Sequence, residues 1–486
     1  MNIQIGLADV LLISPMLALF LASLIPITIK VLKGNVEQAP FATLVQGLGG
    51  ILAATVLLMM VAGSGSTAFA DALVLDGLTK WMGFVALAGA AGAVLLMYDN
   101  PSTNGDQFSE LMFLTLSSVI GMLILVSAVD LLVVFIGLET MSLALYLMIA
   151  MSHEQRLSKE AALKYFILGS FASAIFLYGI AFLFGTVGST YIPNIIASTG
   201  DLISSSRLFV FGITLVIIGF CFKVSIAPFH AWTPDVYQGA PTPHTAYMAT
   251  AIKAVSFAAF LRIISTKSLV GSENLLDFLQ WLAVLTMIVG NVAALLQNNF
   301  KRMLAFSSVA HSGYLLVGVI TTGISDNMSF AASGVIFYLA AYTLMTLGAF
   351  AVVALIEKDE NSSVKIEDLA GYAKKRPLMA FCLTLFLLSL AGIPPLVGFF
   401  GKFYMFAAAI GEGLLWLAVW GVLNSVISVY YYLRPIVVMY MKEGEEDEAP
   451  RSFRATKTAI LVSAILVVFL GLVSGPLFEA VEKALS

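Results

Sequence analysis

Residues 226–230 read Ile-Ala-Pro-Phe-His, and they interrupt an apolar run that is otherwise long enough to cross a membrane. Proline removes a backbone donor and clashes with the preceding helical turn, so Pro228, with Pro234 after it, should break this helix inside the bilayer. Residues 391–398, Ala-Gly-Ile-Pro-Pro-Leu-Val-Gly, interrupt a second apolar run in the same way. The sequence therefore predicts two broken transmembrane helices.

The two interruptions match each other without gaps at an offset of 167 residues (393 − 226). The matched pairs are Ile226 with Ile393, Pro228 with Pro395, Trp232 with Phe399, Val236 with Phe403, and Tyr237 with Tyr404. Broken helices at corresponding positions of two halves are the sequence pattern of transporters built from inverted repeats. Because the match is short, two unrelated proline kinks are the alternative.

The composition is typical of a polytopic helical membrane protein. Of the 486 residues, 60% are hydrophobic and only 11% are charged, and the mean hydropathy is +0.97. A span needs about 20 apolar residues, so an all-α fold of about fourteen transmembrane helices is expected, with helices 7 and 12 broken. The expected spans are 10–30, 42–63, 76–98, 108–128, 131–151, 161–187, 208–227, 243–265, 275–297, 301–322, 328–356, 377–411, 414–440 and 456–476.

The spans predict four parts. Residues 1–105 hold the first three helices. Two inverted five-helix repeats should follow, helices 4–8 in residues 106–268 and helices 9–13 in residues 269–442. Residues 443–486 hold an acidic loop, Glu443 to Glu448, which we interpret as a solvated tether, and helix 14.

Lys and Arg are divided unevenly between the two sets of loops. The loops after odd-numbered helices hold fifteen, and those after even-numbered helices hold five. By the positive-inside rule, the odd-helix loops should be cytoplasmic and both termini should lie on the opposite side. The first set is Lys30, Lys33, Arg156, Lys159, Lys301, Arg302, Lys358, Lys365, Lys374, Lys375, Arg376, Lys442, Arg451, Arg454 and Lys457, and the second is Lys80, Arg207, Arg262, Lys267 and Lys483.

Five charged side chains lie deep inside stretches that otherwise predict membrane-spanning helices: Glu139, Lys164, Lys223, Lys253 and Lys402. Each costs about 2.5–3.5 kcal/mol at the centre of a membrane helix, so they are functional candidates. Lys253 is nine residues from His244 and nine from Arg262, about 13 Å from either, which places it at mid-membrane. Glu139 needs a cationic partner at such a depth, and Lys164 on the next helix is the expected one. For Lys164 the alternative is a side chain that reaches the headgroups from near the start of its helix.

Lys223 precedes the Pro228 break by five residues and Lys402 follows Pro395 by seven. Unwound carbonyls and helix ends beside such breaks can hold a cation, and a buried lysine near a carboxylate can alternate between binding and releasing a proton. The pattern therefore predicts a line of proton-carrying stations. His230 and His311 are candidate intermediates because histidine titrates near neutral pH, although His311 is equally consistent with a hydrogen-bonded core histidine.

Redox and nucleotide chemistry have no sequence support. Cys221 and Cys382 lie singly in apolar runs, without the spacing of iron–sulfur, haem or disulfide motifs. No Gly-rich nucleotide motif and no His/Cys metal-ligand spacing is present, and a haem held by His230 and His311 is possible only in principle. We therefore expect no cofactor in this chain, no metal, no direct NADH binding and no nucleic-acid partner.

Four motifs carry a family resemblance: Gly-Leu-Glu-Thr at 137–140, Ala-Leu-Lys-Tyr-Phe at 162–166, the stretch from Phe-Lys-Val-Ser to Ala-Pro-Thr-Pro at 222–243, and Ala-Gly-Ile-Pro-Pro-Leu-Val-Gly-Phe-Phe-Gly-Lys-Phe-Tyr at 391–404. Over nearly its whole length the chain resembles the subunit N family of bacterial NADH–quinone oxidoreductase, respiratory complex I. A lysine at position 402 favours subunit N over subunit M, whose members carry a glutamate there. The chain is also too short for the extra lateral helix of subunit L.

The resemblance implies an antiporter-like subunit of the bacterial inner membrane, with both termini periplasmic. It would pump protons while partner membrane-arm subunits and the chains that hold FMN, iron–sulfur clusters and the quinone site pass electrons from NADH to quinone. Two other classes remain open, a subunit of a multi-subunit Mrp-type cation/proton antiporter and a purely structural membrane subunit. The resemblance to subunit N also implies a role for each candidate residue. Glu139 and Lys164 would form a charge pair between helices 5 and 6, and His230 would be a histidine beside the helix-7 break. Lys223 would be the helix-7 lysine, Lys253 the helix-8 bridge and Lys402 the helix-12 exit station.

Overall fold

The computed structural model describes residues 6–100, 103, 107–151, 156–270, 272–357, 364–444 and 453–486. Within these residues, twelve helical segments are long and apolar enough to cross a membrane. They are α2 (Ser14–Leu32), α3 (Pro40–Val61), α4 (Gly77–Asp99), α5 (Phe108–Ser127), α6 (Leu131–Ala150), α7 (Arg156–Val187), the continuous segment Thr242–Ile264, α14 (Glu273–Leu295), α15 (Phe300–Ile324), α16 (Met328–Ile356), α20 (Leu415–Met441) and α21 (Arg454–Leu472).

Two further spans are broken at the expected places. Helix 7 consists of α9 (Arg207–Lys223) and α10 (Trp232–Gly239), and helix 12 consists of α18 (Pro377–Ala391) and α19 (Val397–Gly411). With the twelve continuous segments they make the fourteen spans that the sequence predicts. The peptide bonds before Pro228 and Pro395 are both cis, and Gly392, which ends α18, has a φ of 88° that favours glycine.

The remaining elements are short. The segment Thr242–Ile264 is built from α11 (Thr242–Tyr247), the π-helix η1 (Met248–Ile252) and α12 (Lys253–Ile264). A small antiparallel hairpin, which the all-α expectation missed, pairs β1 (Ser66–Ala68) with β2 (Leu73–Leu75) in the register Ser66 to Leu75. The others are α1 (Leu7–Leu12), α8 (Ile192–Ser205), α13 (Lys267–Val270), the 3₁₀-helix η2 (Ile366–Leu369), α17 (Tyr372–Lys375) and α22 (Ser474–Leu485).

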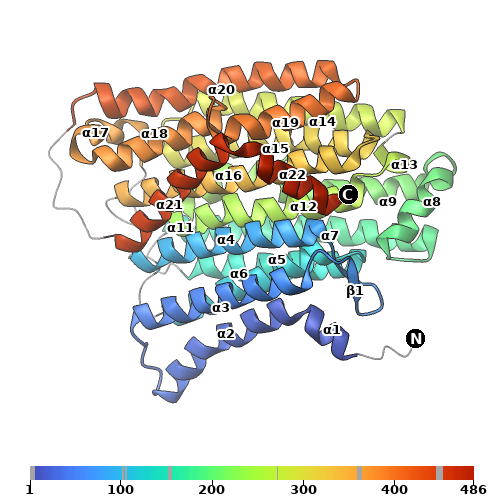
Figure 1. Cartoon of the computed structure of the whole chain (residues 1–486), viewed down its shortest axis with the longest axis horizontal. Helices are drawn as coiled ribbons and strands as arrows, with labels where there is room; N and C mark the ends of the chain where they lie inside the picture. The colour runs from blue at the N-terminus through green and yellow to red at the C-terminus, as the bar shows by residue number, and fades with distance from the viewer. Residues whose placement is uncertain are drawn as a thin grey trace.

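The helices lie side by side along one common direction (Figure 1). α2 and α3 form an outer layer beside α4 and α5, whereas α21 and α22 cross the outer face of α16. The centre is formed by the segment Thr242–Ile264, α15 and α16. In the most apolar stretch of each, 94%, 94% and 83% of the residues are buried. Lys253 on the first of these helices and His311 on the second are therefore placed in the middle of the bundle.

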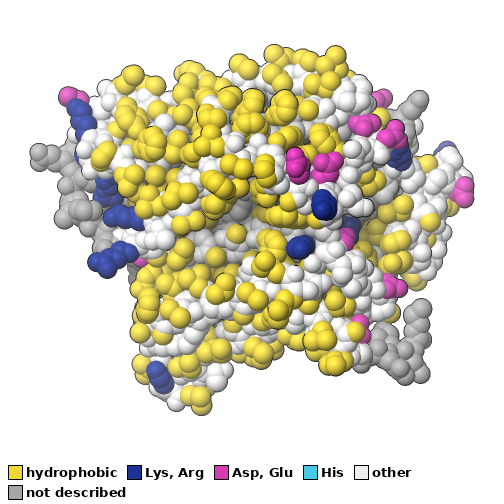
Figure 2. Space-filling view, viewed as in Figure 1, with side chains coloured by type: hydrophobic (Ala, Val, Ile, Leu, Met, Phe, Trp, Pro, Cys, Tyr) yellow, Lys and Arg dark blue, Asp and Glu magenta, His cyan; other side chains and the backbone are white. Residues whose placement is uncertain are grey.

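The two ends of the bundle differ in charge. On the face shown in Figure 2, apolar side chains cover most of the surface, several Lys and Arg side chains gather toward the end where α17 lies, and most of the visible Asp and Glu side chains lie toward the opposite end. This is the direction of asymmetry that the loop count predicts. The acidic loop of the sequence analysis is described only at Glu443 and Gly444, and its other residues lie outside the described part.

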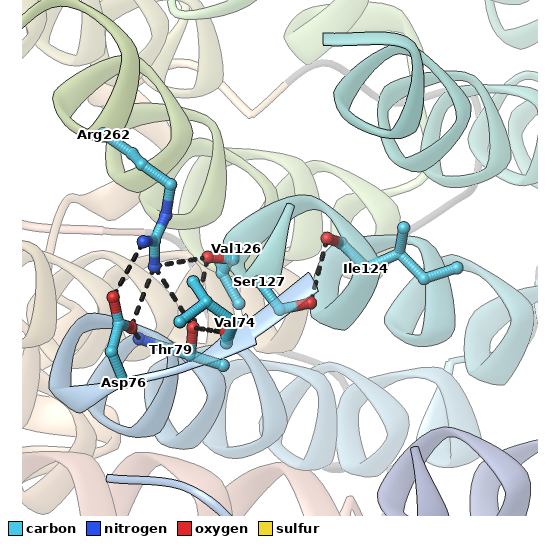
Figure 3. Close-up of polar contacts among 7 residues, drawn as sticks. All are labelled: Val74, Asp76, Thr79, Ile124, Val126, Ser127 and Arg262. Atoms are coloured by element: carbon cyan, nitrogen blue, oxygen red, sulfur yellow. Dashed lines mark hydrogen bonds and ion pairs between the residues drawn. The ribbon is translucent and has the colours of Figure 1, made fainter. Parts of the chain in front are cut away.

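An ion pair joins α4, α5 and α12 beside the hairpin, at the end of the bundle that holds the loops after even-numbered helices (Figure 3). Arg262 near the end of α12 donates two hydrogen bonds to Asp76, of 2.7 and 2.9 Å, and a third of 3.0 Å to the carbonyl of Val126 near the end of α5. Asp76 also caps α4, because its carboxylate accepts from the backbone N–H of Thr79 at 2.9 Å. Burial opposes ionisation of Asp76, but the hydrogen bonds and charge of Arg262 outweigh it and hold its pKa below the usual value.

Candidate functional site

Lys223, the last residue of α9, is held by neutral hydroxyl groups at the helix-7 break. Its Nζ donates to Ser142 Oγ of α6 at 2.7 Å and to the Tyr165 hydroxyl of α7 at 3.3 Å. Glu139 lies three residues before Ser142 on α6, and its carboxylate accepts a hydrogen bond from the Ser173 hydroxyl of α7. Glu139 and Lys223 thus lie at the same junction of α6, α7 and α9, and each is hydrogen-bonded to a serine of a neighbouring helix.

A small cavity is lined by both of these serines. Its volume is about 20 Å³, and its polar lining includes Ser142, Ser173 and Lys223. A water molecule needs at least about 10–15 Å³ and two to four polar partners. The junction therefore has room for about one water between the Glu139 side and the Lys223 side.

Lys164 does not pair with Glu139, so the predicted contact is wrong in this structure. Its Nζ lies 2.8 Å from Glu160, one turn earlier on α7, and 2.9 Å from Asp235 on α10. Lys164 is eight residues from the start of α7, whereas Glu139 is eleven residues from the adjoining end of α6. A lysine so placed reaches carboxylates at the helix end more easily than a carboxylate deeper in the bilayer. Its side chain is 42% exposed.

Asp235 is a charged residue that the sequence analysis did not single out. It binds Arg302 at 2.7 Å as well as Lys164, and Arg302 also donates to Gln238 at 3.1 Å. The offset of the two breaks offered a signal for it, because 235 + 167 = 402 places Asp235 at the position equivalent to Lys402. The equivalent positions of the two repeats thus carry opposite charges.

Lys253 lies at the centre of the bundle and is 4% exposed. Its Nζ donates to the backbone carbonyl of Ser308 on α15 and to Ser308 Oγ at 2.7 Å. The same ammonium lies 5.3 Å from the centroid of the Tyr342 ring on α16, within the range of a cation–π contact. Lys253 is therefore held between two central helices by a neutral residue and an aromatic face.

His311 lies one turn after Ser308 on α15 and uses both ring nitrogens. Nδ1 is hydrogen-bonded to the Tyr338 hydroxyl and Nε2 to the Tyr432 hydroxyl at 3.0 Å. On the same helix, the Ser312 hydroxyl donates to the carbonyl of Val224, next to Lys223 at the helix-7 break. α15 therefore connects the two repeats, and both ring nitrogens of His311 are engaged by tyrosines.

Lys402 on α19 reaches back across the helix-12 break. Its Nζ donates to the carbonyls of Leu390 and Ala391, both at 3.1 Å, and to Ser425 Oγ of α20 at 2.7 Å. It also lies 4.9 Å from the centroid of the Tyr314 ring. The last carbonyls of a helix attract a cation, so the end of α18 supplies a site for this ammonium.

A buried network beside Lys402 also escaped sequence reasoning. Asn291 Nδ2 donates to the Tyr314 hydroxyl at 3.1 Å and to Asn424 Oδ1 at 3.3 Å, and its Oδ1 accepts from the Tyr431 hydroxyl at 2.9 Å. Asn291 is 0% exposed. The network fixes the Tyr314 ring that faces Lys402. An uncharged Asn in an apolar run was its only sequence signal.

His230 stands apart from this line. It is half-buried beside the break, its ring centroid is 6.4 Å from that of Phe306, and its buried Nδ1 has no hydrogen-bond partner within the described residues. The described part of the chain also contains no group of three or more His, Cys, Asp or Glu that could hold a metal ion. Cys221 and Cys382 are free and buried.

The chain matches a known family over most of its length. The family described as NADH:quinone oxidoreductase/Mrp antiporter, TM, matches residues 128–428. The chain is similar to NADH-quinone oxidoreductase subunit N of Bdellovibrio bacteriovorus, with 71% identity over 485 residues and 100% coverage of both chains.

Solved structures agree with this match. A chain of respiratory complex I from Thermus thermophilus with bound aureothin superposes with a TM-score of 0.82 at 33% identity, covering 96% of this chain and 99% of that one. A chain of the Mrp complex from a Dietzia species superposes with a TM-score of 0.83 at 21% identity, covering 99% and 97%. At that identity the second likeness concerns the fold alone.

Proposed function

Because this chain belongs to the family of NADH-quinone oxidoreductase subunit N, we propose that it carries protons through the membrane arm of respiratory complex I along its buried lysines. The observation that carries the proposal is the placement of Lys223, Lys253 and Lys402. Each lies at depth in the bundle, and each is held by serine hydroxyls, carbonyls or tyrosine rings. The 71% identity to a subunit N favours this function over that of a Mrp-type antiporter subunit.

The neutral partners suit a proton carrier. A hydroxyl group can accept a hydrogen bond from a charged lysine and donate one to a neutral lysine, so it accommodates both protonation states. A buried lysine tied to a carboxylate would keep its proton more tightly. Lys223, Lys253 and Lys402 can therefore alternate in charge, and a nearby charge such as Glu139 can bias that alternation.

The order of the stations follows from the contacts. Glu139 and Lys223 share the junction of α6, α7 and α9, and Ser312 links the helix-7 break to α15. Lys253 contacts Ser308 of α15. His311 lies one turn after Ser308 on the same helix and is hydrogen-bonded to Tyr432, on the side of Lys402. The proposed path runs from Lys223 through Lys253 and His311 to Lys402. His230 is proposed as a side station at the helix-7 break.

The outer face of α6 is proposed as the contact with a neighbouring membrane-arm subunit. Leu132, Ile136, Leu143 and Leu147 are exposed on this face, and Glu139 lies between them at the same helical spacing. A carboxylate facing lipid at this depth is costly, so a protein neighbour that supplies a hydrogen-bonding or cationic group suits it. We assign Lys164 to the cluster of charges that it forms with Glu160, Asp235 and Arg302 at the end of this face.

Electron transfer and NADH binding are proposed to belong to partner chains of the complex. The groups at depth that carry the proposed path are lysines, hydroxyls and His311, which can move protons and not electrons. The chain is placed in the bacterial inner membrane with its odd-helix loops in the cytoplasm, on the support of the loop charges.

The test replaces Lys223 or Lys402 with Met in the assembled complex. NADH-driven proton pumping in membrane vesicles should fall at least severalfold, whereas NADH oxidation by a soluble artificial acceptor should stay at the wild-type level. The free energy of unfolding in detergent should be unchanged or raised by about 1–3 kcal/mol, because a buried charge has been removed. Loss of stability in step with activity would instead identify the lysines as structural groups.

A further inference from the structure

The C-terminal arm of the chain packs along the half-helix that carries Lys402. The arm consists of α21 and α22, which follow one another with a bend at Val473, although the sequence predicted a single helix over 456–476. Both lie against α16, and α21 also packs on α19 (Figure 1). α19 is thus enclosed between the central helix α16 and the C-terminal arm.

The first contact of the arm is with the helix-12 break itself. Gly471, near the end of α21, lies so close to residues 395–397 that an added Cβ would overlap the Pro395 carbonyl oxygen and lie 2.8 Å from the Val397 nitrogen. Both obstacles are backbone atoms, which cannot move aside as a flexible side chain can. The bend of helix 14 therefore lies directly against the break of helix 12.

The second contact is an aromatic one, two residues beyond Lys402. The Tyr404 ring of α19 stacks on Phe478 of α22, with centroids 4.1 Å apart and an interplanar angle of 26°. The Tyr404 hydroxyl lies 3.3 Å from Ser474 Oγ, and Phe478 also packs edge-on against Phe330 of α16 at 5.1 Å. Phe478 is 5% exposed. Stacked aromatic pairs of this kind contribute about 0.5–1.5 kcal/mol beyond their buried area.

The arm is anchored at both ends to α4, outside the second repeat. The backbone N–H of Thr456 donates to Asp99 Oδ2 at 2.7 Å, and the Ala484 carbonyl lies against Gly77, where a Cβ would not fit. Lys402 must reach the carbonyls of Leu390 and Ala391 across the break, so its contacts depend on where α19 stands relative to α18. A fixed arm determines that placement.

We propose that α22 is a positioning element for proton transfer, and that Phe478, acting through Tyr404, sets the distance between Lys402 and the end of α18. Phe478 touches no transferred proton, so its effect is indirect. The inference rests on the proposed role of Lys402. It extends the functional unit of the chain from the two repeats to the C-terminal arm.

The test uses Phe478→Ala and Phe478→Leu in the assembled complex. Phe478→Ala removes the support of Tyr404 and should lower the number of protons pumped per NADH severalfold, while Phe478→Leu keeps most of the packing volume and should stay near the wild type. Hydrogen exchange should rise in residues 397–411 in Phe478→Ala and stay unchanged in residues 207–223. Leu19→Ala, a fully buried truncation on the remote helix α2, is the matched control and should alter neither readout.

Lys402→Met, measured in parallel, separates the two proposals. If Lys402→Met pumps normally, the role of Lys402 is wrong and the inference fails with it. If Lys402→Met is defective but Phe478→Ala pumps normally, the inference alone is wrong. An equal loss of pumping in Leu19→Ala would show that any packing defect lowers the number of protons pumped per NADH, and it would also overturn the inference. Tyr404→Phe keeps the ring and should retain most of the pumping.

Discussion

The four lysines of the candidate site are of two kinds. Lys223, Lys253 and Lys402 have hydroxyl, carbonyl and aromatic partners, whereas Lys164 lies within 3 Å of two carboxylates. A lysine between two carboxylates is held in its charged form, and a lysine among neutral groups is free to change its charge. At the scale of residues, we therefore propose that Lys164 is a fixed charge and that the other three lysines are the carriers.

Glu139→Gln should lower NADH-driven proton pumping while the complex still assembles. The glutamine carbonyl can still accept the hydrogen bond from Ser173, so packing is kept, but the negative charge near Lys223 is lost. We expect a loss of severalfold, measured by quenching of a pH-sensitive dye in vesicles. Glu160→Gln, which neutralises an exposed partner of Lys164, is the control and should have a smaller effect. Wild-type pumping in an assembled Glu139→Gln complex would contradict the biasing role.

The site residues that carry charge within an apolar run were predictable from the sequence, whereas Asp235, which lies in the polar stretch after the helix-7 break, was not singled out. A lysine in an apolar run is visible without a structure, which is how Lys253 and Lys402 were found. The partner of Lys164 was not predictable, because it depends on how far a flexible side chain reaches toward the helix end. Asn291 and Tyr431 were missed because uncharged polar residues are common in transmembrane helices.

At the scale of elements, the two helix breaks were predictable and the bends were not. Pro228 and Pro395 marked the breaks of helices 7 and 12, although proline alone does not suffice, because Pro26 and Pro435 lie inside the continuous helices α2 and α20. The π-helix at Met248–Ile252 has no such marker and depends on tertiary packing. The bend at Val473 was missed although Pro476, three residues later, marks it, because the expected span was continued to residue 476. The small hairpin was missed because its strands have three residues each.

Asp76→Asn should destabilise the joint between α4, α5 and α12 without removing the cap of α4. Asparagine also caps helices well, so the change isolates the loss of charge beside Arg262, which we expect to cost about 3 kcal/mol. Because the folded-state pKa of Asp76 lies below its usual value of 3.8, the ion pair contributes its full stability above pH 4 and loses it as the pH falls through the lowered pKa.

The measurement is the unfolding temperature of the detergent-purified complex against pH. Wild type and Asp76→Asn should differ by a constant amount between about pH 5 and pH 8, and should converge in acid below pH 4. A difference that persisted unchanged in acid would show that Asp76 acts through packing and not through its charge.

At the scale of the whole molecule, the number of spans was predictable from hydropathy, but their arrangement was not. Fourteen apolar runs give fourteen helices in any order of packing. That the segment Thr242–Ile264, α15 and α16 occupy the centre follows only from the structure, where they are the most buried. Central placement is what lets Lys253 of the first repeat contact Ser308 and Tyr342 of the second.

The orientation can be tested with single cysteines at the two ends. Ser204 on α8 and Lys374 on α17 are exposed, whereas the native Cys221 and Cys382 are buried and should not react. In intact bacterial cells, Ser204→Cys should react with a membrane-impermeant maleimide, and Lys374→Cys should react only after the cells are opened. The reverse pattern would place both termini in the cytoplasm.

The contact of Lys402 with the end of α18 also bears on ion selectivity. The carbonyls of Leu390 and Ala391 form the kind of oxygen pair that strips and coordinates an alkali cation at an unwound helix. Here a tethered ammonium already fills that place, so sodium or potassium would have to displace a cation that cannot diffuse away. If Lys402 is the proposed proton station, we therefore expect the broken helix to select by prior occupancy, so that it accepts a charge that arrives as a proton and excludes one that arrives as a metal ion.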